Sequence, residues 1–247
     1  MRRYSAHLPL TGIGAAGQQH IRDAHVVLIG VGGLGCAVAQ YLVSSGTGRL
    51  TLCDFDRVAE SNLARQILYR QTDLGRLKTE AASEALQNLN PETQLESVTQ
   101  RMRDEDMQTL FPACDLVVDT SDNYGTRLAV NRICLELKIP WIMASCIRME
   151  GQILLMRPDM PAQACYRCIY GSAPDTLEDC PGAGIFAPVA GIVGASAAYF
   201  ALAHLAGIKT PAGLQLFDAT NWQWQSLKVT MRPDCKDCSH ENTELTR

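Results

Sequence analysis

The chain of 247 residues lacks an excess of positive charge, a long apolar run, and any internal repeat or low-complexity tract. Its net charge of −4 gives no sign of the basic surface that binds nucleic acid or anionic membranes. No apolar run reaches the ~20 residues needed to cross a bilayer, and residues 188–206 come closest. We therefore expect neither nucleic acid nor a membrane as a partner.

An export signal is also missing, which affects how the cysteines are interpreted. Arg2 and Arg3 are not followed by an apolar stretch, so we expect no secretory signal. Ten cysteines in such a chain indicate a reducing, cytoplasmic compartment, where thiols serve metal binding or chemistry rather than disulfides. We expect one domain over residues 1–247, with a nucleotide-binding half (26–145) and a second half (146–240).

A strand, a glycine turn and a helix stand near the start of the chain. Residues 26–29 are branched and apolar, and a G-x-G-G-x-G turn (30–35) and a helical apolar pattern follow. Glycines let the backbone approach a phosphate, and the first helical turn offers unpaired N–H groups. The next strand (50–53) ends in Asp54, placed to bind a ribose hydroxyl. The pattern predicts a nucleotide site; the alternative is a tight turn with no ligand.

Further strands and helices alternate up to residue 145, and then the pattern changes. Strands are predicted at 95–98, 115–120 and 141–145, helices at 75–90 and 126–138, and a small helix capped by Asp104. After a strand at 152–156 we expect a long loop (157–187), a buried helix (188–206) and a strand pair (214–217 and 222–229). This predicts an α/β fold: a Rossmann-like, doubly wound mixed sheet, parallel in the N-terminal half with antiparallel strands in the C-terminal half.

Two C-x-x-C pairs, separated by 66 residues, stand out among the cysteines: Cys165 with Cys168, and Cys235 with Cys238. Two such pairs complete a four-sulfur zinc site of structural type, which would pin the long loop to the C-terminal segment. Redox dithiols are the competing interpretation, disfavoured because neither pair is predicted to open a helix after a strand. The third interpretation is that the four cysteines have no shared function.

Polar side chains gather downstream of Asp54 and at the end of a later strand. Asn62, Arg65 and Lys78 are donors suited to a triphosphate. Asp122 is placed to carry Mg²⁺, which prefers carboxylate and phosphate oxygens. Taken singly, each of these residues is better explained as a solvated surface charge, and it is their joint placement around one sheet edge that favours a functional site.

Taken in order, these features resemble the ThiF/MoeB/HesA family, bacterial relatives of ubiquitin-activating enzymes. The resemblance extends from Arg3-Tyr4 to Cys238 and includes the glycine turn, L-x-D-x-D (52–56), S-N-L-x-R-Q (61–66), Lys78, D-x-x-D-N (119–123) and both C-x-x-C pairs. It implies a homodimeric adenylyltransferase that uses ATP and Mg²⁺ to adenylate the C-terminal glycine of a small ubiquitin-like sulfur carrier. It also implies thiamine or molybdopterin biosynthesis as the pathway, and a sulfurtransferase or cysteine desulfurase as a further partner.

The resemblance implies site residues as well. Arg65, Lys78, Asp122 and Cys180 would be catalytic, Cys180 through sulfur or thioester chemistry in the crossover loop, and the four paired cysteines would bind zinc. The nucleotide-binding residues would be Gly30, Gly32, Gly33, Asp54, Ser61, Asn62, Arg65, Gln66, Lys78, Asp122 and Asn123.

One departure from the family pattern lies near the N-terminus. Family members read R-Y-x-R-Q, and the second arginine reaches into the partner subunit's ATP site. Here the run is Arg3-Tyr4-Ser5-Ala6-His7. Either Arg2, Arg3 or His7 substitutes for that arginine, or its contribution is lost.

Two alternative functions, each from another class of protein, remain open. An NAD-dependent oxidoreductase would use the glycine turn and Asp54 but not Asn62, Arg65 and Lys78. A non-catalytic adaptor of the same fold is made more plausible by Ala6. The carrier is also open: residues 210–218 look more like ThiF, which we favour, and residues 147–152 more like MoeB.

Overall fold

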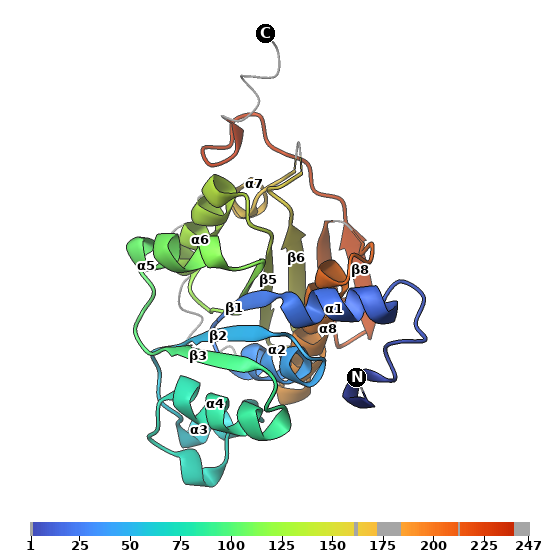
Figure 1. Cartoon of the computed structure of the whole chain (residues 1–247). Helices are drawn as coiled ribbons and strands as arrows, with labels where there is room; N and C mark the ends of the chain where they lie inside the picture. Colours follow the sequence, from blue (N-terminus) through green and yellow to red (C-terminus); the bar gives the residue numbers. More distant parts are fainter. Residues whose placement is uncertain (1, 161–162, 172–183, 212, 240–247) are drawn as a thin grey trace.

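In the computed structural model, which describes residues 2–160, 163–171, 184–211 and 213–239, helices cover both faces of one mixed sheet (Figure 1). The sheet has eight strands in the order β3-β2-β1-β4-β5-β6-β7-β8. The parallel strands are β1 (His25–Ile29), β2 (Arg49–Cys53), β3 (Gln94–Val98), β4 (Leu116–Asp119) and β5 (Trp141–Ile147). The antiparallel strands are β6 (Glu150–Met156), β7 (Leu214–Asp218) and β8 (Gln223–Leu227). The predicted fold class is confirmed.

The helices form a layer on each face because the central strands are apolar on both faces. In β1, Val26 and Leu28 pack into one core while Val27 and Ile29 pack into the other. The first core is covered by α2 (Gly33–Ser44), α4 (Lys78–Leu89) and α8 (Ala187–Leu205). The second is covered by α5 (Asp104–Leu110), α6 (Tyr124–Leu137) and α7 (Tyr166–Tyr170). The remaining helices are short: α1 (Gly14–Asp23), α3 (Glu60–Leu63), and the 3₁₀ turns Arg2–Tyr4, Gln71–Asp73 and Phe111–Ala113.

Helix α8 is the most apolar of the longer helices in the described chain. Its 19 residues are long and apolar enough to cross a membrane by length and composition, and half of that stretch is buried inside the protein. It packs on α2, β5 and β6, and Gly194 brings it close to the backbone of α2. Packing in the first core accounts for its composition.

Two expectations from the sequence were wrong in detail. The region 157–187 is not all loop, because α7 opens at Cys165, its N-cap residue. Five residues of helix are too few to produce a detectable periodicity. The short helix after β3 is capped by Asp106, whose side chain accepts the N–H of Arg103, whereas Asp104 is its first residue.

Candidate active site

The glycine turn is held in a shape that side chains would prevent. Gly30 has φ +83°, and a Cβ there would lie 3.1 Å from the backbone of Thr120. A Cβ on Gly35 would lie 2.0 Å from the carbonyl oxygen of Gly30. Asp54 fixes the turn from β2, because its Oδ2 accepts the N–H of Val31 at 2.8 Å. The turn therefore delivers the first N–H groups of α2 to the end of β1, where an anion is favoured.

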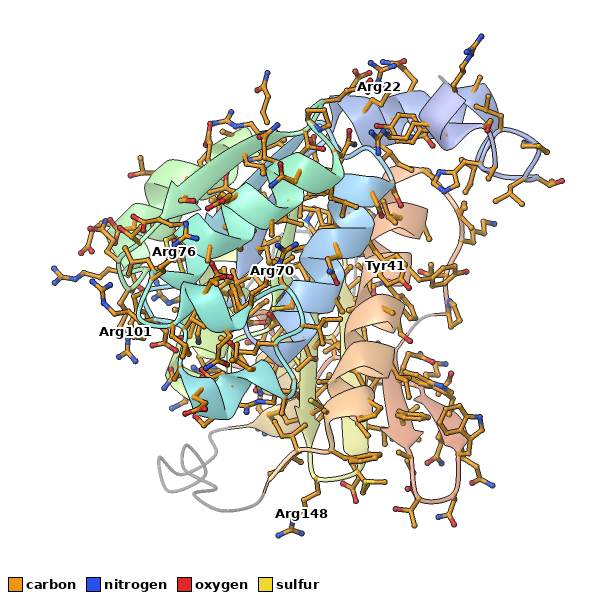
Figure 2. The ribbon with its side chains drawn as sticks, turned by 90° about the horizontal axis from the view of Figure 1, so that it is seen from below. Arg22, Tyr41, Arg70, Arg76, Arg101 and Arg148 are labelled. Atoms are coloured by element: carbon orange, nitrogen blue, oxygen red, sulfur yellow. The ribbon has the colours of Figure 1, made fainter. Side chains whose placement is uncertain are left out.

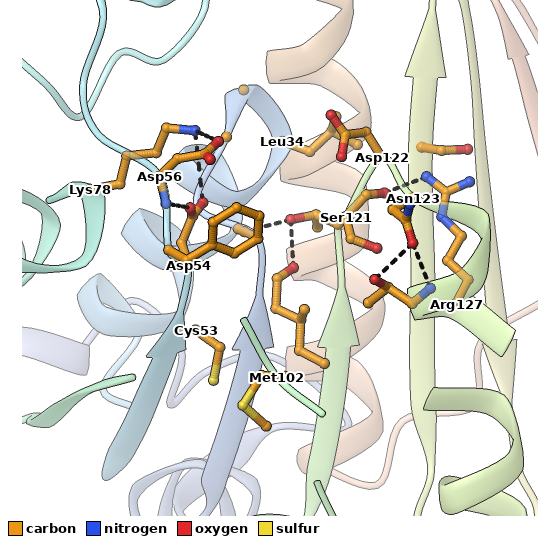
Figure 3. Close-up of a pocket in the computed structure, with 18 of the residues that line it drawn as sticks. Leu34, Cys53, Asp54, Asp56, Lys78, Met102, Ser121, Asp122, Asn123 and Arg127 are labelled. Carbon is orange, nitrogen blue, oxygen red and sulfur yellow. Dashed lines mark hydrogen bonds and ion pairs between the residues drawn. The ribbon is translucent and has the colours of Figure 1, made fainter. Parts of the chain in front are cut away.

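This turn lies where the strand order reverses. β1 pairs with β2 on one side and with β4 on the other, and ligands of open α/β sheets bind at the carboxyl ends of strands at such a point. A cavity of about 190 Å³ opens there between the ends of β1, β2, β4 and β5 (Figure 3). The described part of the chain thus forms a cavity at the position where this fold class binds nucleotides.

One wall of the cavity carries a compact cluster of charges after β2. The Lys78 Nζ lies 2.7 Å from Asp56 and 3.9 Å from Asp54 (Figure 3). The Lys78 side chain is buried, with the residue only 5% exposed, so its positive charge faces the cavity rather than bulk solvent. Arg65 also lines the cavity, and its guanidinium donates to the carbonyl of Ser61 at 3.1 Å. Two cations on this wall can meet the oxygens of a polyphosphate.

The opposite wall is built by the loop after β4 and the start of α6. Asp122 is exposed at the cavity, while Asn123 is the N-cap of α6 and accepts the N–H of Thr126 at 2.8 Å. One turn later Arg127 enters the cavity and donates to the carbonyl of Ser121 (Figure 3). This wall therefore combines a solvent-accessible carboxylate with a third cation.

The structure brings most of the predicted nucleotide residues together. Those that line the cavity are Gly30, Gly32, Gly33, Asp54, Arg65, Lys78, Asp122 and Asn123. Ser61, Asn62 and Gln66 are not among its lining residues. Gln66 is buried beside the glycine turn, with its Nε2 3.8 Å from where a Cβ on Gly32 would be. Cys180 lies outside the described residues.

Sequence reasoning missed several lining residues, all of them close behind strand ends. They are Gln100, Arg101 and Met102 after β3, Arg127 in the first turns of α6, and Ser145 and Cys146 at the end of β5. Applying the strand-end rule to β3 and β5 as well would have pointed to the residues that follow them, whereas Arg127 reaches the cavity from within α6, after a strand to which the rule had already been applied. Cys146 is the most unusual, because burial raises the pKa of its thiol to about 11.

The four paired cysteines form a second, separate cluster. All four are buried, and their Sγ atoms lie within 4.8 Å of one another. Individual separations are 3.8 Å for Cys165–Cys168, 3.6 Å for Cys165–Cys235 and 3.4 Å for Cys168–Cys238. Tetrahedral zinc with Zn–S bonds of about 2.3 Å needs sulfurs about 3.8 Å apart, so the cluster fits that ion.

The surroundings of the cysteines also suit a metal. The hydrogen bond from the Cys238 thiol lowers the pKa of Cys165, which favours the thiolate there, and the same bond raises the pKa of Cys238. The N–H of Arg232 points at the Cys168 sulfur at 3.4 Å. Four sulfurs around one zinc ion would leave no position for a substrate, and such a closed site has a structural role.

Comparison with known proteins shows the family. Residues 4–238 match the profile of the ThiF family. The chain belongs to the ThiF family. The sulfur carrier protein ThiS adenylyltransferase of Escherichia coli K12 is 39% identical over 243 residues, covering 98% of this chain and 96% of that protein.

Two further comparisons give a second sequence relative and a similar solved structure. The molybdopterin-synthase adenylyltransferase of the same strain is 37% identical, covering 96% of both chains. The crystal structure of E. coli MccB has a TM-score of 0.82 and 25% identity, covering 96% of this chain and 72% of that one. The family resemblance inferred from the motifs is confirmed, and its named relatives are adenylyltransferases.

Proposed function

We propose that this ThiF-family chain is an adenylyltransferase that activates the C-terminal carboxylate of a ubiquitin-like sulfur carrier with ATP. The observation that carries the proposal is the cavity where the start of α2 meets Arg65, Lys78 and Arg127 at the ends of parallel strands. The names of its relatives, which act on ThiS or serve molybdopterin synthase, support the substrate class. Their near-equal identities, 39% and 37%, leave the choice between thiamine and molybdopterin carriers to experiment.

The adenylation reaction requires stabilisation of negative charge and does not require a general base. A terminal carboxylate has a pKa of about 3.5 and is already ionised at pH 7. It attacks the α-phosphorus of ATP, a C–O–P bond forms, and the P–O bond to pyrophosphate breaks. No histidine is among the described residues that line the cavity. The cations there can take up charge as pyrophosphate leaves, which is the step a protein can most assist.

To bind the triphosphate, the ammonium group of Lys78 exchanges its ion pair with Asp56 for contacts with phosphate oxygens. In the structure its Nζ is neutralised by Asp56 at 2.7 Å. A triphosphate entering beside α2 offers stronger acceptors, and Asp56, with a side chain 53% exposed, can return to solvent. Lys78 is therefore held at the site by Asp54 and Asp56 before the nucleotide arrives.

Mg²⁺ fits the wall after β4. Asp122 is a hard oxygen ligand that is exposed at the cavity. A magnesium ion bound with the triphosphate would supply Lewis-acid stabilisation of the phosphate oxygens. Asp122 would hold it from the protein side, while Asn123 caps α6 and fixes the loop that presents the carboxylate.

The adenylation proposal is tested by ATP–pyrophosphate exchange with purified ThiS-type and molybdopterin-type carriers. We expect exchange that depends on the carrier and on Mg²⁺. Asp122→Asn should lower exchange by about 100-fold or more, because it removes a charge that acts where the reaction develops charge. The exposed carboxylate of Asp23 on α1 provides the control: Asp23→Asn should keep the parental rate. Exchange by Asp122→Asn at the parental rate would contradict the assigned role.

Two alternatives are separated by the same assay. Nicotinamide-dependent absorbance change without exchange would favour an oxidoreductase, which has no use for Arg65 and Lys78 beside the glycine turn. Nucleotide binding with no exchange for any carrier would indicate a non-catalytic adaptor.

Cys180 is proposed to act after adenylation, because forming an acyl-adenylate needs no thiol. We expect Cys180→Ser to retain pyrophosphate exchange but to lose any covalent adduct with the carrier and to slow sulfur transfer from a sulfurtransferase or cysteine desulfurase. Intact-mass analysis of enzyme, carrier and ATP together measures the adduct. An adduct that persists in Cys180→Ser, or loss of exchange, would exclude this role.

We further propose that the chain acts as a homodimer in the cytoplasm. An apolar groove beside α1, α2 and α8 supports the dimer. Its lining includes Tyr41, which is 52% exposed (Figure 2), and Tyr199, which is 55% exposed. Sedimentation analysis of the parent and of Tyr199→Glu tests this, with a shift toward monomer expected for the variant.

Of the three candidate substitutes for the family's missing arginine, Arg2 is exposed, whereas Arg3 and His7 make contacts within their own subunit. The guanidinium of Arg3 donates to the carbonyl of Leu89 at 3.0 Å, and His7 Nδ1 lies 2.7 Å from Gln18 Oε1. Both side chains are thus engaged within their own subunit.

A further inference from the structure

A buried asparagine of α6 contacts both cysteine pairs. Asn131 is 0% exposed and is not one of the four sulfur ligands. Its Oδ1 accepts the N–H of Tyr166, the residue after Cys165, at 2.8 Å. Its Nδ2 donates to Oδ2 of Asp237, the residue before Cys238, at 2.8 Å. One side chain thus reaches the middle of each C-x-x-C pair.

The two pairs also contact each other directly, through the buried sulfurs of Cys165 and Cys235 and of Cys168 and Cys238, and through one ion pair nearer the surface. Asp237 uses its other oxygen, Oδ1, for an ion pair with Arg167 Nε at 2.7 Å. The Arg167 side chain is 24% exposed, so solvent screens this contact more than the contacts of Asn131. Besides the cysteine sulfurs, the carboxamide of Asn131, which is 0% exposed, therefore also bonds to both pairs.

The chemistry of the amide suits this position. One group must accept from a backbone N–H and donate to a carboxylate at the same time, and an amide has an oxygen acceptor and an NH₂ donor side by side. A carboxylate at residue 131 could accept but not donate, and it would face the negative charge of Asp237. An aliphatic residue would leave a buried N–H without a partner, which is costly.

We propose that Asn131 is a positioning residue that sets the two cysteine pairs at zinc-binding separation and ties them to α6. The inference rests on the proposed zinc site. Because the same helix carries Asn123 and Arg127 one or two turns earlier, the pairs are anchored to the element that forms one wall of the nucleotide cavity. Groups that orient metal ligands typically change metal affinity by about 10- to 100-fold when they are lost.

The test measures zinc release from full-length, zinc-loaded protein into an excess of a chromophoric chelator. Asn131→Asp should release zinc at least about 10-fold faster than the parent, because its donor to Asp237 is lost. The double variant Asn131→Asp with Asp237→Asn exchanges donor and acceptor. The new amide at position 237 donates to the new carboxylate at position 131, while its oxygen still accepts from Arg167. We expect the double variant to recover a release rate within about 3-fold of the parent, as expected for residues coupled by contact.

The zinc-release test includes a matched control, and a second variant for the case in which Asn131→Asp does not fold. Asn88→Asp makes the same chemical change at an exposed position on α4 and should release zinc at the parental rate. If Asn131→Asp fails to fold by circular dichroism, Asp237→Ala removes the same contact from the C-terminal side and should also accelerate release. Parental release from Asn131→Asp, or a double variant no slower than the single one, would overturn the proposal. A parent that binds no zinc would instead contradict the zinc site itself.

Discussion

The carboxylates after β2 show how the chain prepares a phosphate site before any phosphate binds. Asp54 is committed to the backbone: one oxygen accepts from Val31 at 2.8 Å and the other from Asp56 at 2.9 Å. It still has acceptor capacity for a hydroxyl, since an ionised carboxylate can accept about four hydrogen bonds. Its first task is to shape the glycine turn, and Asp56 takes the larger part in holding Lys78.

Cys146 gives a prediction at the same scale. Burial raises the pKa of its thiol to about 11, despite the nearby positive charges of Arg65 and Arg127. At pH 7.5 the pKa lies about 3.5 units above the pH, so only about one thiol in 3,000 is the reactive thiolate. We expect its alkylation by iodoacetamide to be slow at pH 7.5 and to rise about tenfold per pH unit up to pH 10.

Peptide mapping by mass spectrometry measures this modification site by site. Because Cys146 lines the cavity, ATP with Mg²⁺ should slow its labelling. Cys146→Ser identifies the labelled peptide by its disappearance. Rapid labelling at neutral pH that ATP does not affect would show that the thiol is neither buried nor part of the cavity.

At the scale of elements, the contact of α8 with α2 positions the glycine turn. A Cβ on Gly194 would lie 2.6 Å from the carbonyl oxygen of Leu34 and 2.9 Å from the Cβ of Ala37. Both belong to the first turns of α2, whose N–H groups face the cavity. The absence of a side chain at Gly194 therefore sets how closely α8 supports the phosphate-binding end of α2.

Gly194→Ala should destabilise the protein by about 1–3 kcal/mol, because neighbouring backbone cannot move aside as a flexible side chain can. Gly191, one turn earlier on α8, is the matched control, since nothing lies within 4 Å of where a Cβ on it would be. Gly191→Ala should be neutral or stabilising by up to about 1 kcal/mol, because alanine favours helix more than glycine. Urea unfolding of the two variants measures the difference, and equal stabilities would contradict the close α8–α2 contact.

At the scale of the whole molecule, the sheet and the cysteine cluster join parts of the chain that are far apart in sequence. β7 and β8 extend the sheet beyond β6, and the segment after β8 returns to α7 and α6 (Figure 1). Cys235 and Cys238 lie in this last segment, which has no helix or strand of its own within the described residues 228–238. Its position depends on contacts with the rest of the protein.

We expect one zinc per chain, measured by elemental analysis of protein purified without added metal. Removing it with a chelator should lower the melting temperature and expose the segment 228–238 to limited proteolysis, because a structural zinc site contributes its binding energy to folding. Readdition of zinc should restore protection. Metal-free protein that is equally resistant to heat and protease would exclude a structural zinc.

The sequence alone determined the parts of this protein that depend on local pattern. The glycine turn, Asp54 and the alternation of apolar strands with helices predicted the nucleotide cavity, because glycine geometry and side-chain period are properties of neighbouring residues. The spacing of the C-x-x-C pairs predicted the cysteine cluster for the same reason. The family motifs likewise follow one another along the chain.

Only the tertiary structure decided which distant side chains meet. Arg127 and Cys146 enter the cavity because β4 and β5 lie beside β1, and the link from Asn131 to Asp237 spans 106 residues. The run 61–66 matched the family motif as a whole, yet of its residues named as candidates only Arg65 lines the described cavity. Which face of a short helix points inward depends on what packs against it. That information resides in the folded contacts and not in the local pattern.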